Sequence, residues 1–371
     1  MPKRSIRPLL CLHVLVLLWI GLAGCSVVRA SERRMSRTLD RAGLLERTWE
    51  HGSQTIHYWR GGSGPPLLLL HGFGGDARWQ WHRQAAAFVD THTLIIPDLP
   101  GFGASSWSGD TPSLEQQADA MASLLDHLGT SEAAVVGISY GGLVAWQLAR
   151  RHPDRVARLA LVGSPGPAYE REDLESLLRR FGERNVADIV IPRDPAGVRR
   201  LLELAYARPP SPPDWVLRQI HRDMIVPRQR DQRALMADLE GDLERYAAQR
   251  DPPSMPVLLV WGRDDPVFPL AIGRRLQRLW SDTATLVVID ETRHAPNLEQ
   301  PVPFNRALDS FLRADERVAL GASILEAASA DELAQNRRGW HVIGVDGDEV
   351  IEQAQEAERR GVRRMLARHL E

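Results

Sequence analysis

The feature that most constrains the fold is a series of short, uninterrupted apolar runs separated by longer helical stretches. Strands buried on both faces of a parallel sheet need apolar residues at every position, because helices pack on both faces. Six runs fit this pattern, PLLLLHG, HTLIIPD, AAVVGIS, VARLALVG, MPVLLVWG and ATLVVID, beginning at residues 66, 92, 133, 156, 255 and 284. Segments such as 113–128 and 142–151 are long and periodic enough to be crossover helices. The sequence therefore predicts an α/β protein with a doubly wound, mostly parallel sheet.

The segments between and beside these runs define the domain organisation. In the segment 48–60, Thr55, His57 and Trp59 alternate with Ile56 and Tyr58, and a GGSGPP break follows. This pattern predicts a hairpin at a sheet edge. About ninety residues separate the runs that end near 164 and begin at 255, which is too long for a structureless loop. Helical periodicity within that stretch predicts a helical cap at about 166–253, inserted into a main domain at 47–314. Residues 315–371 are highly charged and predict a mainly helical C-terminal extension.

The N-terminus has the pattern of an export signal. Lys3, Arg4 and Arg7 precede an apolar run that ends in small residues, which is typical of a secretory signal peptide at 1–24. The sequence LAGC, ending at Cys25, resembles the lipobox of bacterial lipoproteins, in which the cysteine is acylated and becomes the new N-terminus. An ordinary signal peptide or an uncleaved anchor is the alternative.

These N-terminal features predict an exported, lipid-anchored protein of the cell envelope. Ser26 stands where an inner-membrane retention signal often has aspartate, which favours the outer membrane in an organism that has one. Residues 25–46 are polar and Arg-rich and predict a tether between the lipid and the folded domain.

Charge and cysteine content exclude several functions. The formal net charge of the 371-residue chain is −2, and it falls to −5 when residues 1–24 are removed, so no positive field would attract nucleic acid. Cys11 and Cys25 are the two cysteines, which leaves the exported protein without an intrachain disulfide or a thiolate metal site. We therefore expect no nucleic-acid partner and no thiolate-bound metal.

A candidate nucleophile follows the third apolar run. Residues 137–141 read GISYG, a GxSxG pattern between a predicted strand and a predicted helix. Glycines on both sides allow a sharp strand-to-helix turn that exposes the hydroxyl of Ser139 at the helix N-terminus. The exposed N–H groups there favour developing negative charge. A small residue in a tight turn is the alternative interpretation.

Serine needs a base, and the base needs an orienting group. In this architecture these partners follow in the order acid then histidine, each just past a later strand. Asp264 and Asp265 follow VLLVWG, and His294 follows ATLVVID. The pattern predicts Ser139, one of the two aspartates and His294 as a catalytic triad.

Together these motifs resemble the serine branch of the α/β-hydrolase superfamily over about residues 48–314. In that family the acid is the last residue of GxxD, which maps onto Asp265. The histidine motif GHxxxxE is matched by His294 and Glu299, but Arg293 replaces the glycine. The resemblance implies that HGFGG is the oxyanion loop, with the backbone N–H groups of Phe73 and Tyr140 as donors.

Two further segments belong to this resemblance. Residues 98–105 match the DxxGxGxS loop of the family, which we interpret as scaffold. Trp79, Trp81 and His82 lie just beyond the oxyanion loop and could line a pocket for an apolar acyl group or pack within a helix interface.

The resemblance implies a serine esterase or lipase that acts on a small-molecule ester with an apolar acyl part and that requires no metal or organic cofactor. Serine at position 139 argues against haloalkane dehalogenases and epoxide hydrolases, which use aspartate there. Hydrolases of C–C bonds, lactonases and cofactor-free perhydrolases share the triad and remain alternatives. An envelope binding protein that kept the fold is the non-enzymatic alternative.

Overall fold

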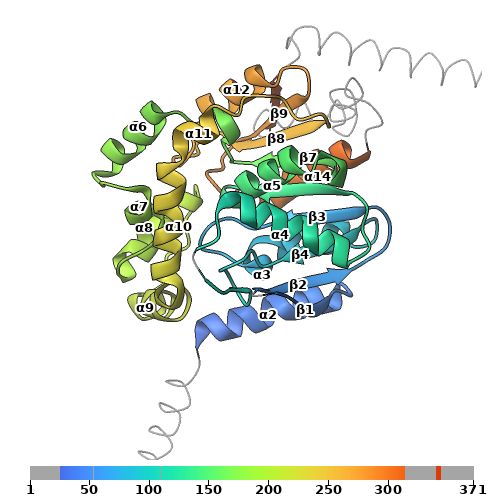
Figure 1. The fold of residues 1–371 in the computed structure, drawn as a ribbon. Coiled ribbons are helices and arrows are strands. Elements are labelled where there is room, and N and C mark those ends of the chain that lie inside the picture. The colour runs from blue at the N-terminus through green and yellow to red at the C-terminus, as the bar shows by residue number, and fades with distance from the viewer. Residues whose placement is uncertain (1–25, 53, 110, 314–339, 344–371) are drawn as a thin grey trace, which may run out of the picture.

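The computed structural model describes residues 26–313, except 53 and 110, and strand 340–343 (Figure 1). The predicted signal peptide at 1–24 and the predicted lipidation site Cys25 lie outside the described residues. Of the predicted C-terminal extension, residues 340–343 are described, and they form a strand.

The centre of the molecule is a mostly parallel sheet. Among the described residues its strand order is β1-β2-β4-β3-β6-β7-β8-β9-β10, with β5 paired to β2. Pairs from β4 through β3, β6, β7, β8 and β9 are parallel, whereas β1, β2, β5 and β10 pair antiparallel. The strands are β1 (Leu45–His51), β2 (Gln54–Gly61), β3 (Pro66–Leu70), β4 (Thr93–Pro97), β5 (Ser106–Trp107), β6 (Ala133–Ile138), β7 (Val156–Val162), β8 (Val257–Gly262), β9 (Ala284–Ile289) and β10 (Trp340–Ile343).

The apolar runs form strands because both faces of the sheet are covered. Leu68 and Leu70 of β3 belong to one hydrophobic core, and Leu67 and Leu69 of the same strand belong to the core on the opposite face. All four side chains are fully buried. A strand between two cores has no position at which a polar residue meets solvent, which confirms the prediction of a doubly wound sheet.

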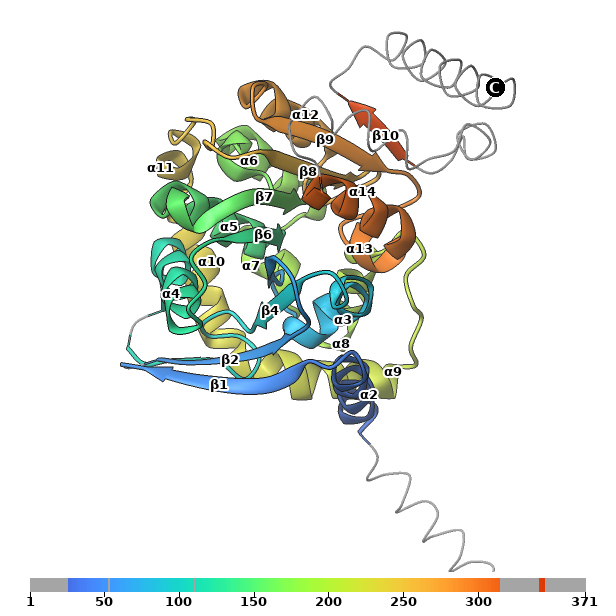
Figure 2. The ribbon, with the colours of Figure 1, turned by 90° about the vertical axis from the view of Figure 1, so that its right-hand side faces the viewer.

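Helices form a layer on each face of the sheet (Figure 2). The first core includes α4, α5 and α12, and the second includes α3 and α14. The helices of the main domain are α2 (Val27–Arg41), α3 (Ala77–Phe88), α4 (Leu114–His127), α5 (Tyr140–Arg151), η1 (Pro153–Arg155), α12 (Leu270–Leu279), α13 (Pro296–Glu299) and α14 (Pro301–Arg313). None of the helices within the described ranges is long and apolar enough to cross a membrane.

The predicted edge hairpin is confirmed. β1 and β2 pair antiparallel, with Trp49 opposite Ile56. His57 of β2 closes the hairpin onto the sheet, because its ring nitrogens hydrogen-bond Asp98 at 2.9 Å and Glu46 at 2.7 Å. Burial alone would lower the pKa of His57, but the hydrogen bonds and charges of the two carboxylates outweigh burial and raise that pKa.

Helices fill the long connection between β7 and β8. They form a lobe beside the carboxyl ends of the strands (Figure 1). Their bounds are η2 (Gly166–Ala168), α6 (Arg171–Phe181), α7 (Val186–Val190), α8 (Pro195–Ala205), α9 (Asp214–Ile220), η3 (His221–Ile225), η4 (Val226–Arg228), α10 (Gln229–Gly241) and α11 (Leu243–Ala247). We call this lobe the cap.

The segment predicted as a tether at 25–46 is instead structured. Residues 27–41 form α2, which packs against α3, and strand β1 begins at Leu45. Val28 and Leu39 are buried, and Met35 is half-buried between them. Their spacing of seven and four places them on one face of a helix, and this apolar stripe is sparse among the arginines that suggested a solvated tether.

Candidate active site

Ser139 lies at the sharp turn between β6 and α5. Its φ of 53° and ψ of −120° place a non-glycine residue in a strained region of backbone space. The turn is fixed from the next strand, because the Ser139 N–H donates to the carbonyl of Val162 at 2.8 Å. Buried neighbours in β6 and α5 hold the turn in this conformation, which places the half-buried Ser139 side chain at the N-terminus of α5.

Both glycines of the GxSxG pattern are required because backbone carbonyl oxygens approach them closely. A Cβ on Gly137 would lie 2.2 Å from the carbonyl oxygen of Gly141, and a Cβ on Gly141 would lie 2.3 Å from that of His71. No side chain fits at such distances. The two glycines therefore let α5 start directly against β6 and the end of β3.

Asp265 and His294 are hydrogen-bonded to each other. His294 Nδ1 lies 2.8 Å from Oδ2 of Asp265, whose side chain is fully buried. Oδ1 of the same carboxylate accepts the N–H groups of Val267 at 2.8 Å and Phe268 at 3.0 Å. Because a carboxylate can only accept, Nδ1 carries the hydrogen, and in the neutral form of the ring Nε2 has a free lone pair.

The structure distinguishes between the two candidate acids. Asp264 is exposed, and its backbone N–H donates to the carbonyl of Thr292. Asp265 contacts His294 directly. The structure therefore brings Asp265, and not Asp264, to the histidine.

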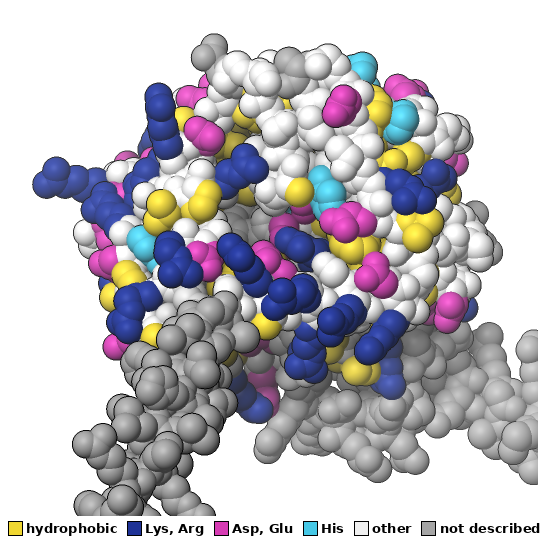
Figure 3. All heavy atoms as spheres, turned by 90° about the horizontal axis from the view of Figure 1, so that it is seen from below, with side chains coloured by type: hydrophobic (Ala, Val, Ile, Leu, Met, Phe, Trp, Pro, Cys, Tyr) yellow, Lys and Arg dark blue, Asp and Glu magenta, His cyan; other side chains and the backbone are white. Residues whose placement is uncertain are grey.

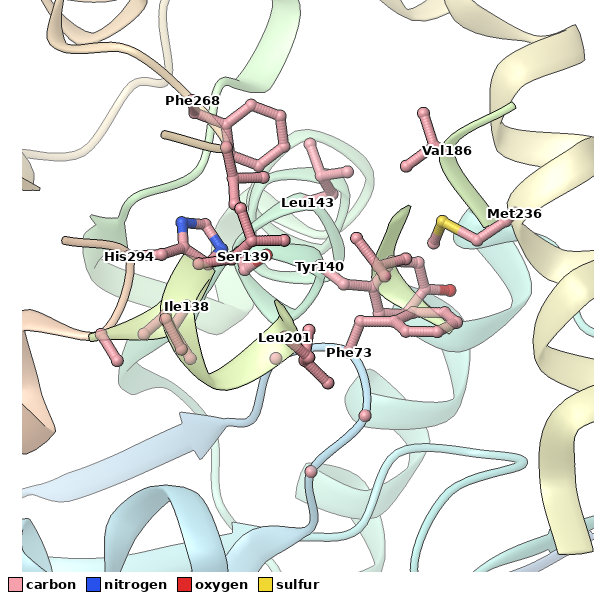
Figure 4. A pocket seen from close by; sticks show the side chains of 18 of the residues that line it. Phe73, Ile138, Ser139, Tyr140, Leu143, Val186, Leu201, Met236, Phe268 and His294 are labelled. Carbon is pink, nitrogen blue, oxygen red and sulfur yellow. The ribbon is translucent and has the colours of Figure 1, made fainter. Parts of the chain in front are cut away.

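Ser139 and His294 line the same cavity. Figure 4 shows the imidazole of His294 beside Ser139, with Met236 and Val186 at the opposite end of the cavity. A lone pair at Nε2 can accept a proton from a serine hydroxyl. The arrangement can thus activate a serine nucleophile.

The loop after β3 approaches Ser139 closely. A Cβ on Gly72 would lie 3.4 Å from the Cβ of Ser139. Among the hydrogen bonds of the described residues, none uses the backbone N–H of Phe73 or Tyr140, and both residues line the cavity. These two N–H groups are therefore available as donors.

The phenol of Tyr140 forms a hydrogen bond away from the oxyanion site. Its oxygen accepts a hydrogen bond from Gln117 Nε2 at 2.6 Å. Complete burial raises the pKa of this phenol well above its usual value, so the phenol stays neutral. Tyr140 can act on a substrate through its backbone N–H.

The cavity has a volume of ≈ 300 Å³ and is mostly apolar. Its wall is built largely by the cap, including Leu174, Leu177, Val190, Leu202, Met224 and Leu239. No lysine or arginine is found among the described residues that line it. Of the three residues beyond the oxyanion loop, Trp79 lines the cavity. Trp81 of α3 is fully buried in the core, and His82 bonds the carbonyl of Arg78.

One residue beside the catalytic pair was missed by sequence reasoning. Gly163 has φ +49°, and a Cβ there would lie 3.3 Å from Asp265 Oδ2 and 3.4 Å from His294 Nδ1. The glycine directly after the apolar run VARLALV was the available signal, but a glycine at a strand end usually indicates only a turn.

The loop that carries His294 is attached to the cap. Glu299 accepts the N–H of Arg293 at 2.7 Å with one oxygen and the N–H of Ala207 at 2.6 Å with the other. The Ala295 N–H donates to the carbonyl of Ala205 at 3.1 Å. Arg293, which replaces the family glycine, bonds the carbonyl of Glu203 with its guanidinium. The departure from the family motif therefore adds a contact between the histidine loop and α8.

Comparison with known proteins identifies relatives among hydrolases. A family model described as alpha/beta hydrolase fold matches residues 65–301. The pimeloyl-[acyl-carrier protein] methyl ester esterase of Aeromonas hydrophila subsp. hydrophila is 30% identical over 68% of this chain and 97% of its own length. The 2-hydroxymuconate semialdehyde hydrolase of Pseudomonas sp. strain CF600 is 30% identical over 70% of this chain and 90% of its own. The chain spans only 65% of the length of a further curated relative, at 29% identity.

A solved structure extends the similarity. The crystal structure of a membrane phospholipase A, a bacterial virulence factor, aligns with a TM-score of 0.67 at 28% identity. The alignment covers 83% of this chain and 98% of the phospholipase chain.

Proposed function

Since the chain belongs to the α/β-hydrolase fold family, we propose that this hydrolase cleaves carboxylic esters through an acyl-enzyme formed on Ser139. The observation that carries the proposal is the geometry at one end of the cavity. A strained serine at the N-terminus of α5 shares that cavity with a histidine whose Nδ1–H is held by the buried carboxylate of Asp265.

The proposed reaction proceeds in two halves. Ser139 Oγ attacks the ester carbonyl carbon while His294 Nε2 takes the hydroxyl proton. The N–H groups of Phe73 and Tyr140 bind the resulting oxyanion. The C–O bond to the alcohol then breaks, and His294 returns the proton to the leaving oxygen. Water, deprotonated by His294, releases the acid from the enzyme and restores Ser139.

The cavity wall favours a neutral, apolar acyl group. Aliphatic side chains from the cap dominate the lining, and Glu240 is an acid among them. The named substrate of the muconate semialdehyde hydrolase relative carries a carboxylate. A carboxylate in the present cavity would meet Glu240 and no arginine or lysine, which disfavours C–C hydrolysis of such an anion as the activity of this chain.

A chain-length series of p-nitrophenyl esters tests the proposal. The mature protein should hydrolyse esters with aliphatic acyl chains and should be labelled by a fluorophosphonate. Ser139→Ala should abolish labelling and reduce kcat by several orders of magnitude, because no other group can form the acyl-enzyme.

Two outcomes would decide against an esterase. Equal turnover by wild type and Ser139→Ala across all chain lengths, without fluorophosphonate labelling, would support the non-enzymatic binding protein. Labelling at Ser139 with no ester turnover, but with turnover of a lactone, of a C–C substrate or of a carboxylic acid with hydrogen peroxide, would assign one of the triad-sharing alternatives.

We also propose that the protein is exported and anchored to a membrane through lipidated Cys25. Support comes from the charged, apolar and small-residue sequence that ends in LAGC. The similarity to a membrane phospholipase A is consistent with a substrate drawn from lipid. Cys25→Ser should abolish labelling by a fatty-acid analogue in cells and release the protein from the membrane fraction. Unchanged membrane retention without labelling would contradict lipidation.

A further inference from the structure

The N-terminal helix is fastened to the cap at its first residues. Ser26 Oγ donates to Asp223 of η3 at 3.3 Å, and the Val27 N–H donates to Gln219 of α9 at 2.9 Å. Figures 1 and 2 both place α2 and α9 side by side at one end of the molecule. The described chain therefore starts on the cap, one residue after Cys25.

This end of the molecule exposes a cluster of arginines. Arg33, Arg37 and Arg41 are spaced by four residues and form one exposed stripe along α2. Seen from this side, the surface is crowded with basic side chains (Figure 3). We define the basic face by its exposed side chains, which are Arg33, Arg34, Arg37 and Arg41 of α2 and Trp215 and Arg218 of α9.

Nearby acids do not neutralise these arginines. On the cap, Asp214 pairs with Arg199 and Asp223 pairs with Arg222. On α2, Glu32 lies 3.6 Å from Arg78 of α3. These three acids are thus taken up by other arginines, whereas Asp40 of α2 is exposed and forms no ion pair within the described residues. The five arginines of the basic face form no ion pair in the described part of the chain, and they outnumber Asp40.

An exposed aromatic residue accompanies the charge. Trp215 is 49% exposed at the start of α9, and Val226, just past η3, is also 49% exposed. Tryptophan is enriched at membrane interfaces because its ring is apolar and its N–H is polar. Arginines together with an exposed tryptophan match an anionic lipid surface, which offers both charge and an apolar layer.

We infer that the basic face docks on an anionic membrane surface and turns the cap toward the lipid. Each arginine near such a surface strengthens binding roughly fivefold. Part of the cavity wall lies on elements next to the basic face, because Trp79 belongs to α3, which packs against α2, and Met224 belongs to η3, which bonds Ser26. Docking would bring that side of the cavity to the source of lipid esters. The inference rests on the proposed envelope location. The test distinguishes a failure of docking from a failure of the lipid anchor.

The test is footprinting of the full chain on vesicles. The protein is mixed with phosphatidylcholine vesicles, with vesicles of two parts phosphatidylcholine to one part phosphatidylglycerol, or with duplex DNA, which is a polyanion without an apolar layer. Each sample is oxidised by hydroxyl radicals. Mass spectrometry reads oxidation of the Trp215 peptide. Flotation of the protein with the neutral vesicles measures binding through the lipid anchor alone. The Ser139→Ala variant shows whether protection of Trp215 is independent of catalysis.

A matched pair of charge reversals provides the control. Arg33→Glu with Arg37→Glu alters the basic face, whereas Arg274→Glu with Arg278→Glu makes the same change, at the same spacing, on exposed positions of α12. Helix α12 lies at the opposite end of the molecule (Figure 1). Circular dichroism should show that both variants fold, because all four side chains are exposed.

We expect anionic vesicles to reduce Trp215 oxidation at least fivefold relative to neutral vesicles. The α2 double variant should lose this protection, the α12 double variant should keep it, and high salt should weaken it. The inference is overturned by equal oxidation on both vesicles, by equal protection of the two double variants, or by stronger protection from duplex DNA. Protection by anionic vesicles without flotation on neutral ones would retain the docking surface and reject the anchor.

Discussion

At the scale of single residues, Gly163 controls the space beside the histidine and its acid. Its φ of +49° is one that L side chains rarely adopt. The atoms nearest to an added Cβ are Asp265 Oδ2 and His294 Nδ1, which are the two ends of the hydrogen bond that orients the imidazole. A methyl group there would press on both atoms at once.

We therefore predict that Gly163→Ala impairs catalysis in addition to folding. The left-handed backbone should lower the free energy of unfolding by about 1–2 kcal/mol. Displacing the imidazole by a few tenths of an ångström should lower kcat about tenfold with little change in KM. Ester kinetics and urea unfolding measure the two effects.

Gly129→Ala is the matched control. Gly129 has φ +64°, and an added Cβ would meet nothing within 4 Å. This variant should lose a similar free energy of unfolding while kcat stays unchanged. An equal loss of kcat in both variants would mean that backbone strain, and not contact with the catalytic pair, is responsible.

At the scale of elements, Glu299 connects α13 with the histidine loop and the cap. Its two oxygens accept N–H groups from Arg293 and Ala207. Burial raises the pKa of Glu299 and outweighs these hydrogen bonds, which act in the opposite direction. Glu299 therefore stabilises the fold as a hydrogen-bond acceptor, while its negative charge opposes folding.

The two hydrogen bonds predict unequal losses for two substitutions of Glu299. Glu299→Leu removes both acceptors and should lower the free energy of unfolding by about 1–3 kcal/mol for each unpaired N–H group. It should also lower kcat, because the backbone next to His294 is released. Glu299→Gln removes the charge and keeps one of the two acceptors, so one N–H group stays paired and the other faces the amide NH2. It should therefore lose less stability and activity than Glu299→Leu, and equal losses in the two variants would contradict this account.

The raised pKa also predicts a pH dependence of stability. The folded pKa of Glu299 lies above the usual value of 4.5, so its contribution is fully present below pH 4.5 and is lost as pH rises through the folded pKa. Urea unfolding across this range should show the loss in wild type and not in Glu299→Gln. The exposed side chain of Glu203, on α8 next to the same contact, provides a control in Glu203→Gln.

Some of these elements could be predicted from the sequence and others could not. The six buried strands were predictable because both of their faces are apolar, and Ser139, Asp265 and His294 because each follows one of these strands. Helix α2 was not, because its apolar stripe is sparse among arginines. The bonds from the histidine loop to α8 and Ala207 could not be predicted, because they join residues about ninety positions apart through backbone atoms that carry no sequence signal.

At the scale of the whole molecule, the cavity lies between the cap and the main domain. Its ≈ 300 Å³ is at the lower end of the range of about 300–1,000 Å³ that is usual for ligand sites. A cavity of that size suits one acyl chain, with the rest of a lipid left outside. Met236 of α10 and Val186 lie at the end opposite His294, where the far end of such a chain would rest (Figure 4).

Filling that end should therefore shorten the preferred acyl chain. Met236→Trp would exclude the terminal methylenes of an octanoate ester but leave room for butyrate. Each buried methylene contributes about 0.8 kcal/mol, so excluding four should lower kcat/KM for octanoate by about 3 kcal/mol, roughly two orders of magnitude. Activity on butyrate should stay close to that of wild type, because its acyl chain ends near Ser139.

Val302→Trp is the control, because it adds the same side chain on α14, where Val302 is 61% exposed. It should change the activity on neither ester. An unchanged ratio of octanoate to butyrate activity in Met236→Trp would place the acyl chain elsewhere, outside the part of the cavity that the cap encloses.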